Sequence, residues 1–474
     1  MHPDDFRRHA HRVADWMADY LRDVHTLPVL PDVRPGDLRR ALPGSAPDVG
    51  EPFERIFADF ERLIVPGMTH WNHPGFFAYF PANNSPPSIL AEMLTAAMGA
   101  QCMSWLTSPA ATELEQVTMT WVARMLALPD GFTGVIHDTG STSTLVALIS
   151  ARDRAEPSGR GATRLRIYAS NEAHSSVAKG ARLAGYGPDG VRSIATDADL
   201  AMRPEALAAA IAEDRTAGIV PACVVATVGT TSSTAMDPLR AIGEICQRDN
   251  VWLHVDAAWA GSAAILPELR PMLDGIEHAD SFFFNPHKWL FVNFDCSAYY
   301  VRDVDALLRS FALTPEYLRT APDAEVANFR DWGIQLGRRF RALKLWVVLR
   351  SYGVSGLQAM LREHIALGHE FAGWVRAEPE YEVMAPSPVG LVCFRHRPAG
   401  IANDEAALAV RNRAILDRVN RSGRVFLTHT TIHGRYAIRL AVGQRCTRRE
   451  HVQEAWRLVR ESASASASAS GKHA

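Results

Sequence analysis

Short apolar runs alternate with helix-like stretches between residues 133 and 300, and this alternation restricts the fold more than any other feature of the sequence. The apolar runs are Gly134–Ile136, Leu165–Ser170, Ala222–Val228, Val251–Val255 and Ser281–Phe284. Stretches that carry charged residues at helical spacing separate them. Such alternation predicts an α/β fold with a mostly parallel sheet covered by helices on both faces. In sheets of this kind, ligands bind at the carboxyl ends of the strands.

The flanking sequences divide the chain into four parts. Residues 1–85 are expected to form a helical segment that wraps over another surface, because the first helix has an apolar stripe without a partner. Residues 86–376 form the predicted large domain, and residues 377–461 form a smaller α+β domain. The repetitive residues 462–474 are predicted to be a disordered tail. Two strands are expected in the smaller domain, Leu391–Phe394 and Tyr436–Ala441.

Charge and composition argue against several classes of protein. The 474 residues include 50 basic and 52 acidic side chains, so no basic surface for nucleic acid is expected. The chain has no apolar run of about 18 residues, the length that predicts a membrane span, and its beginning lacks the apolar core of a secretory signal. Six scattered cysteines without a C-x-x-C pair favour buried thiols in a reducing compartment. These features predict a cytoplasmic protein.

Lysine is rare in this chain, which narrows the search for a reactive amine. The four lysines are Lys179, Lys288, Lys344 and Lys472. Of these, Lys288 follows an apolar strand-like run, in the sequence SFFFNPHKWLFVNFD. Apolar surroundings lower the pKa of a lysine and make its neutral amine available for a Schiff base. The alternative for any single lysine is a surface side chain packed on an aromatic ring.

A second group of residues precedes Lys288, where the apolar run Val251–Val255 ends in Asp256-Ala257-Ala258. Two very small residues after a buried strand leave room for a flat ring, and the carboxylate can keep a ring nitrogen protonated. Such a pair turns a pyridine into an electron sink. Taken alone, Asp256 is equally well explained as a helix N-cap. Together with Lys288 it favours a pyridine cofactor.

Two further strand ends carry polar residues. Thr139-Gly140-Ser141-Thr142 precedes a predicted helix, where free backbone N–H groups and the helix dipole favour a phosphate. Any capped helix looks similar, so this motif alone is weak evidence. His174, in Ala173-His174-Ser175-Ser176, is predicted to stack on the ring and to touch the substrate carboxylate. A structural histidine is the alternative at that position.

His70 and His73, in THWNHPGFF, have a spacing found in metal sites. No third ligand is evident, and the surrounding aromatic residues favour a packed pocket wall over a metal-dependent hydrolase. The chain has no G-x-S-x-G motif, P-loop or glycine-rich dinucleotide signature. No metal is therefore expected.

The sequence resembles the group II pyridoxal-phosphate decarboxylases, and among them the aromatic-L-amino-acid decarboxylases, over nearly all of residues 1–461. The likeness rests on HWNHPGFFAYFPANNSP, EAHSS, WLHVDAAWAGSA and FNPHKWLFVNFDCSA. The pair of motifs HVDAA and NPHKW, spaced as they are in this chain, is highly specific for this family. The resemblance implies fold type I, as in aspartate aminotransferase, and the cofactor pyridoxal 5'-phosphate. It also implies a homodimer with active sites at the subunit interface, in which the N-terminal segment wraps the partner.

The resemblance also implies a role for each motif residue. Lys288 looks like the lysine that carries the cofactor, Asp256 like the partner of the pyridine nitrogen, and His174 like the residue stacked on the ring opposite Ala258. The phosphate would be held by Thr139, Gly140, Ser141 and Asn285, with support from Thr231 and His287. The substrate pocket would comprise Trp71, Tyr79, Phe80, Pro81, Ala82, Met103 and, from the other subunit, Leu336 and Gly337.

Tyr317, in TPEYLRT, matches the tyrosine of the family's catalytic loop. A phenol there can protonate the carbon left after CO2 departs while the loop excludes water and oxygen. Related aldehyde synthases have phenylalanine at this position. The expected activity is decarboxylation of aromatic L-amino acids, and an O2-consuming aldehyde synthase and an inactive cofactor-binding protein are the alternatives. Ala82, Met103 and Trp259 differ from the animal enzymes, which leaves the preferred substrate open.

Overall fold

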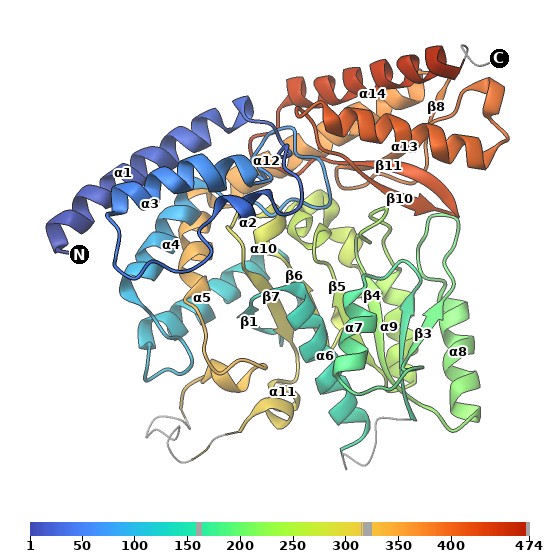
Figure 1. Ribbon diagram of the computed structural model, residues 1–474. Coiled ribbons are helices and arrows are strands. Elements are labelled where there is room, and N and C mark those ends of the chain that lie inside the picture. The colour runs from blue at the N-terminus through green and yellow to red at the C-terminus, as the bar shows by residue number, and fades with distance from the viewer. Residues whose placement is uncertain (158–163, 314, 316–324, 471–474) are drawn as a thin grey trace.

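The computed structural model describes residues 1–157, 164–313, 315 and 325–470 (Figure 1). Its largest sheet has seven strands in the order β1-β7-β6-β5-β4-β2-β3. The strands are β1 (Thr133–His137), β2 (Leu165–Ser170), β3 (Val191–Ile194), β4 (Val220–Thr227), β5 (Trp252–Asp256), β6 (Ser281–Phe284) and β7 (Ser297–Val301). The central pairings are parallel, and β7 runs antiparallel to β1 and β6. The predicted α/β fold with a mostly parallel sheet is confirmed.

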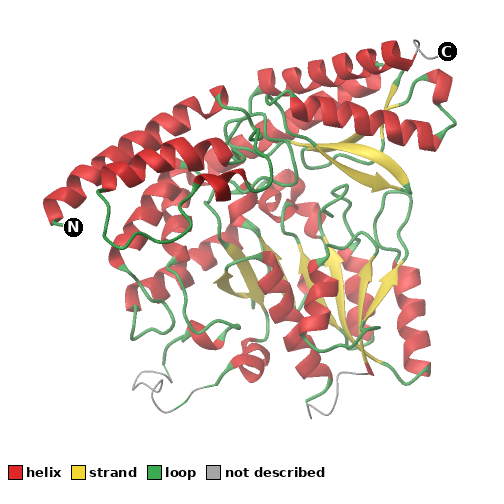
Figure 2. Cartoon of the chain, in the orientation of Figure 1, coloured by secondary structure: helices red, strands yellow, loops and turns green. Residues whose placement is uncertain are grey.

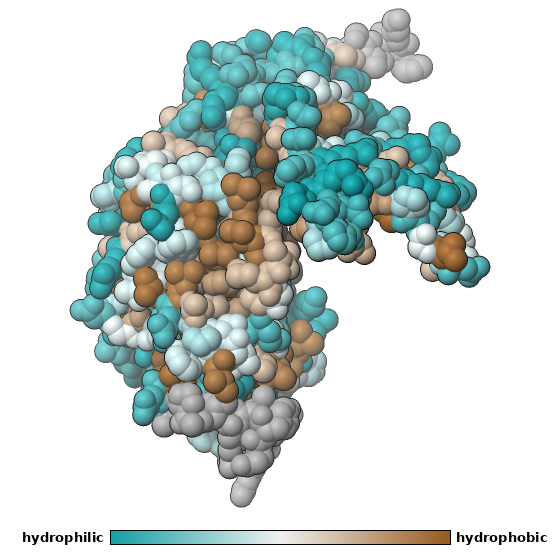
Figure 3. Space-filling model, turned by 90° about the vertical axis from the view of Figure 1, so that its left-hand side faces the viewer, coloured by the Kyte–Doolittle hydropathy of each residue, from teal (hydrophilic) through white to brown (hydrophobic). Residues whose placement is uncertain are grey.

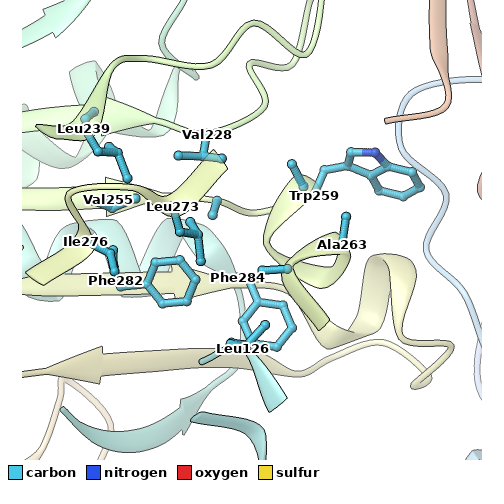
Figure 4. Close-up of a cluster of buried hydrophobic side chains, with 14 of the residues drawn as sticks. Leu126, Val228, Leu239, Val255, Trp259, Ala263, Leu273, Ile276, Phe282 and Phe284 are labelled. Carbon is cyan, nitrogen blue, oxygen red and sulfur yellow. The ribbon is translucent and has the colours of Figure 1, made fainter. Parts of the chain in front are cut away.

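Burial on both faces explains why these strands are continuous apolar runs. Phe282 and Phe284 belong to one hydrophobic core, and Phe283 between them belongs to the other. Figure 4 shows Phe282 and Phe284 on the same face as Val255. The sequence interpretation did not include β3 or β7. Strand β3 is an edge strand with little buried surface, and β7 follows β6 after a single helical turn, which breaks the strand–helix alternation.

Helices lie on both faces of this sheet (Figure 2). They include α5 (Pro109–Met125), α6 (Gly140–Ala155), α7 (Ser176–Leu183), α8 (Pro204–Thr216), α9 (Leu239–Arg248), α10 (Pro286–Trp289) and α11 (Val304–Phe311). Helix α6 follows β1, α7 follows β2 and α10 follows β6, so their N-termini meet at the carboxyl end of the sheet. Within the described residues, no helix is both long enough and apolar enough to cross a membrane.

Four α-helices precede α5 in the chain: α1 (Pro3–Asp23), α2 (Asp37–Ala41), α3 (Phe53–Asp59) and α4 (Pro86–Met98). Helices α1 and α3 lie side by side at the edge of the molecule (Figure 1), where Trp16 packs edge-on against Phe57 and Phe60. This contact covers part of the apolar stripe of α1. Phe6, on the same stripe, remains 62% exposed.

The smaller domain lies against one end of the large sheet (Figure 1). Helix α12 (Arg341–Ala377) leads into it and is kinked at Gly353, whose φ of 63° is left-handed. The remaining elements are β8 (Tyr381–Val383), β9 (Leu391–His396), α13 (Glu405–Arg421), β10 (Thr428–Ile432), β11 (Arg435–Ala441) and α14 (Arg449–Ser470). The four strands form an antiparallel sheet in the order β10-β11-β9-β8.

Helix α14 corrects the prediction of a disordered tail from residue 462. The helix continues to Ser470, and Ser462 and Ala463 are buried. Arg411 on α13 donates a hydrogen bond to the carbonyl oxygen of Ala463 at 3.1 Å, and Arg418 donates to that of Ser462. Alanine has the highest helix propensity, and these arginines bond to carbonyl groups of the helix. Packing on α13 therefore extends the folded chain into the repetitive sequence.

Candidate active site

The predicted cofactor residues line a single cavity of about 160 Å³ at the carboxyl ends of the strands. Its walls include Lys288, Asp256, Ala258, His174, Thr139, Gly140, Ser141, Thr231, Asn285 and His287. The cavity is also lined by residues that the sequence interpretation did not assign to the cofactor site, namely Ser176, Thr227, Gly229, Trp259, Phe283 and Phe294. Several of these lie one or two residues from a predicted strand end, which is the signal that could have identified them.

Lys288 lies in the single turn of α10, immediately after β6. Burial lowers the pKa of its amine, and Asp256 partly opposes that shift. The amine nitrogen is 5.6 Å from the centroid of the Phe80 ring. Phe80 stacks on Trp259 with ring centroids 4.5 Å apart, and Trp259 stacks in turn on Trp289 at 4.2 Å. This aromatic column gives the lysine the apolar setting that its sequence context predicts.

The backbone of Lys288 is held by Asn83, a residue distant in sequence that the motifs did not indicate. The Asn83 side-chain amide donates hydrogen bonds to the carbonyl oxygens of Lys288 at 2.5 Å and of Gly443 at 2.7 Å. Its own carbonyl oxygen accepts the backbone N–H of Arg445 at 3.0 Å. Asn83 thus ties the lysine to the smaller domain.

Asp256 is the last residue of β5 and is buried. The backbone N–H of Ala258 donates to its carboxylate at 3.0 Å. Burial raises the pKa of Asp256, whereas that hydrogen bond and the neighbouring Lys288 and His174 lower it. A buried carboxylate costs free energy unless a cation or several donors compensate it. The geometry therefore suits a protonated ring nitrogen as a further partner.

The N-terminus of α6 is the predicted phosphate site. Thr139 is its N-cap residue, yet no side chain caps the helix, so the first backbone N–H groups stay available to an anion. A β-carbon on Gly140 would lie 2.6 Å from the Phe283 ring, too close for any larger residue without displacement. The side-chain oxygen of Asn285 is buried without a hydrogen-bond partner. The Asn285 side-chain nitrogen would lie 3.1 Å from a β-carbon on Gly140, so this amide donor lies beside the start of α6, where it can bind an anion.

His174 and His287 have different environments. His174 follows β2 and is accessible in the single chain, and its Nδ1 lies 2.8 Å from the Ser176 hydroxyl. His287 is buried, and its Nδ1 accepts the backbone N–H of Cys296 at 2.9 Å. Burial lowers the pKa of His287 to about 3, so this ring is neutral at physiological pH.

The predicted substrate-pocket residues are more scattered. Within the described part of one chain, Phe80 is the member of this set that lines the cavity. Trp71 and Tyr79 stack on each other at 6.0 Å and are exposed, beside Pro81 and Ala82. Met103, Leu336 and Gly337 lie outside this cavity. They flank a backbone hydrogen bond in which the N–H of Cys102 donates to the carbonyl oxygen of Arg338. Their assignment to a shared pocket stays a prediction, and Tyr317 lies outside the described residues.

The histidine pair considered as metal ligands is engaged in other contacts. His70 Nδ1 lies 2.8 Å from the Tyr20 hydroxyl, and His73 Nδ1 accepts the backbone N–H of Gly75 at 2.9 Å. Among the residues that the structure describes, no cluster of three or more His, Cys, Asp or Glu side chains has the arrangement of a metal site. The contacts give both histidines a packing role.

Comparison with known proteins decides the family. The model described as "Pyridoxal-dependent decarboxylase conserved domain" matches residues 35–397. The chain belongs to the pyridoxal-dependent decarboxylases. This decarboxylase is 44% identical to a phenylacetaldehyde synthase of Arabidopsis thaliana, with 98% of this chain and 97% of the relative covered. It is also 44% identical to tyrosine decarboxylase 2 of Narcissus pseudonarcissus, with 98% and 95% covered.

The decarboxylase fold is shared with solved structures. The crystal structure of Oryza sativa TDC with PLP and tryptamine superposes with a TM-score of 0.96 at 41% identity, covering 98% of both chains. The crystal structure of Catharanthus roseus tryptophan decarboxylase in complex with L-tryptophan superposes with a TM-score of 0.93 at 41% identity, covering 98% of this chain and 99% of the other. The enzyme is a carboxy-lyase that uses pyridoxal phosphate. The uncapped α6, the Asn285 amide nitrogen beside Gly140 and the buried Asp256 fit this cofactor.

Proposed function

We propose that this enzyme removes the carboxylate of aromatic L-amino acids as CO2 and releases the corresponding arylalkylamines. The observation that carries the proposal is the meeting of Lys288, Asp256 and His174 in one cavity whose wall includes the aromatic Phe80 and Trp259. Relatives named for tyrosine and tryptophan decarboxylation, at 43–44% identity over nearly the whole chain, support the aromatic substrate class.

Each cavity residue would contribute a defined step. When bound, pyridoxal phosphate supplies an electron-poor ring that takes up the electron pair left by departing CO2. Asp256 would hold a proton at the ring nitrogen, because a buried carboxylate is stabilised by a cationic partner. Lys288, with its lowered pKa, would supply a neutral amine to attach the cofactor and afterwards to release the product.

The remaining residues would orient and protect the reaction. The N-terminus of α6, with Thr139, Gly140, Ser141 and Asn285, would hold the phosphate. His174 would stack on the cofactor ring opposite Ala258 and donate a hydrogen bond to the substrate carboxylate. Tyr317 would deliver the proton to Cα, a role proposed from the sequence alone.

A panel of amino acids tests the substrate class. Purified enzyme reconstituted with pyridoxal phosphate is expected to release CO2 from phenylalanine, tyrosine, DOPA or tryptophan, and to spare glutamate and histidine. CO2 and the amine are measured together. Release from glutamate or histidine at a higher kcat/KM than from every aromatic substrate contradicts the proposal. A yellow holoprotein that releases no CO2 from any substrate would support an inactive cofactor-binding protein.

Aldehyde synthesis is the second candidate, because relatives named as aldehyde synthases are similar in sequence and in fold. Tyr317 favours decarboxylation, since a proton donor next to Cα competes with attack by O2. We therefore predict that Tyr317→Phe lowers amine formation by about 10²-fold or more, the scale of one general acid, and raises H2O2 and aldehyde in step with CO2. Oxygen uptake is measured with an oxygen electrode, and peroxide is measured with a coupled peroxidase.

The wild-type enzyme is the control for this substitution. Stoichiometric peroxide from the wild type would select the aldehyde synthase. A Tyr317→Phe variant with unchanged amine yield would remove Tyr317 from the chemistry and leave it as a loop anchor.

A homodimer forms part of the proposal. Helix α4 exposes Leu90, Leu94 and Met98, the first two by 60% and 58%. Figure 3 shows hydrophobic side chains gathered over the face of the molecule where α4 and α5 lie in Figure 1. Exposed apolar surface of this kind marks an interface. The uncovered part of the α1 stripe, with Phe6, and the distant positions of Leu336 and Gly337 fit a second copy of this chain as the occupant.

We predict that Leu94→Glu breaks this dimer, because a buried charge without a partner costs several kcal/mol. Light scattering after size exclusion is expected to show twice the 52.1 kDa chain mass for the wild type and the single mass for the variant. The activity of the variant is expected to fall as the dimer is lost. Val410→Glu, at a similarly exposed apolar position on α13, is the control. A monomeric wild type with full activity contradicts the shared site.

The expected cytoplasmic location is also part of the proposal. Its support is that the six cysteines are free thiols, five of them buried. This pattern is usual for proteins of a reducing compartment.

A further inference from the structure

His174 is held by the first turn of α7 through its Nδ1 atom. The backbone N–H of Ser176 donates to Nδ1 at 3.1 Å, and the Ser176 hydroxyl oxygen lies 2.8 Å from the same nitrogen. A backbone N–H is always a donor. Nδ1 must therefore be the acceptor, and a proton on Nδ1 would displace this hydrogen bond.

We propose that Ser176 is a positioning residue that holds His174 as the neutral tautomer with its proton on Nε2. Because the N–H of Ser176 already requires a lone pair on Nδ1, the hydroxyl also donates its hydrogen to that nitrogen. Nε2–H is then a fixed hydrogen-bond donor, as contact with a substrate carboxylate requires. This last consequence rests on the proposed function, whereas the tautomer itself does not.

The other groups around His174 shift its pKa in both directions. Burial of part of the ring is the main cause of its lowered pKa, Asp256 raises the pKa, and Lys288 lowers it. The N–H and O–H donors of Ser176 lower the pKa of His174 further, because a hydrogen on Nδ1 would point at the hydrogens of these two donors. Removing the hydroxyl therefore raises the pKa of His174. It also leaves the ring free to adopt the other tautomer or to rotate.

Ser176→Ala tests this directly, because it removes the hydroxyl and keeps the backbone N–H. The pKa of His174 is expected to rise by about 0.5–1 unit, the effect of one neutral hydrogen bond. Diethyl pyrocarbonate modifies neutral imidazole, so its rate against pH reports this pKa in the full-length apoprotein. Trypsin cleavage after Arg166 and Lys179 gives a peptide with His174 as its sole histidine, and mass spectrometry follows that residue alone.

Two variants serve as controls. Ser175→Ala changes an exposed neighbour whose side chain does not cap α7, and it is expected to leave the titration unchanged. Ser176→Thr keeps a hydroxyl and is expected to restore the wild-type pKa. If Ser176→Ala does not fold, Ser176→Gly is the second variant without a hydroxyl. An unchanged modification pKa in a folded hydroxyl-free variant overturns the proposal.

The holoenzyme gives a second measurement. The acid limb of kcat/KM in Ser176→Ala is expected to move upward by the same shift, so kcat/KM falls by about 3- to 10-fold at pH values well below the pKa of His174 and stays within about 2-fold at pH 8. A uniform loss at all pH values would indicate a merely structural serine and would contradict the proposal. If the wild type releases no CO2 from aromatic amino acids, the proposed function fails, while the apoprotein titration still decides the tautomer.

Discussion

Lys288→Ala is expected to lower CO2 release by at least about 10³-fold, roughly 4 kcal/mol of transition-state stabilisation. Its amine lies in the cavity beside the Phe80 ring, and burial lowers its pKa, so it is an amine prepared to react at the cofactor site. Borohydride reduction of the wild-type holoenzyme should fix the cofactor covalently to Lys288. The variant should show no such attachment.

Two other substitutions make this result specific to Lys288. Lys179→Ala removes an exposed lysine of α7 and is expected to retain full activity. Lys288→Arg keeps a positive charge but provides no primary amine, and it should be as inactive as the alanine variant. Substantial CO2 release by Lys288→Ala, or borohydride attachment at Lys179, would contradict the proposed role.

Asp256→Asn is expected to lower kcat by about 10²–10³-fold, roughly 3–4 kcal/mol, without destabilising the apoprotein. The carboxylate is buried with one backbone donor, and burial raises its pKa, so its charge costs folding free energy when no cation is bound. Removing the charge removes that cost and also the partner of the ring nitrogen. Steady-state kinetics and thermal denaturation of the apoprotein measure the two effects.

Asp237→Asn is the matched control, because Asp237 is also a buried aspartate near the end of β4. Its carboxylate accepts the backbone N–H groups of Met202 and Thr227, both at 2.7 Å. The amide cannot accept both bonds in the same way, so a loss of about 1–3 kcal/mol in unfolding free energy is expected. If Asp256→Asn instead lowers the melting temperature and leaves kcat unchanged, Asp256 is structural.

Much of the site follows from local sequence. A parallel strand buried on both faces must be a continuous apolar run, so the ends of these runs mark the carboxyl edge of the sheet. Lys288, Asp256 and Thr139 were predictable because each lies directly after such a run. Strand β7 was not predictable in this way, since only the single turn α10 and a short loop separate it from β6.

Other features depend on contacts between distant segments. Asn83 reaches the carbonyl groups of Lys288 and Gly443, and nothing in its local sequence indicates those partners. The stack of Phe80, Trp259 and Trp289 likewise joins separate segments. The repetitive end of the chain is helical because its alanine-rich helix packs on α13. Composition alone indicated disorder, because it contains no information about that neighbour.

By itself, the sequence determined the α/β fold and predicted the reactive lysine and its aspartate partner, because strand periodicity and residue chemistry are local properties of the chain. The tertiary structure decided how these residues are held: which amide donates to the lysine backbone, which ring lies beside its amine, and which ring nitrogen of His174 accepts a hydrogen bond. Those outcomes depend on side-chain geometry to within about an ångström. Only packing of the complete chain sets distances at that scale.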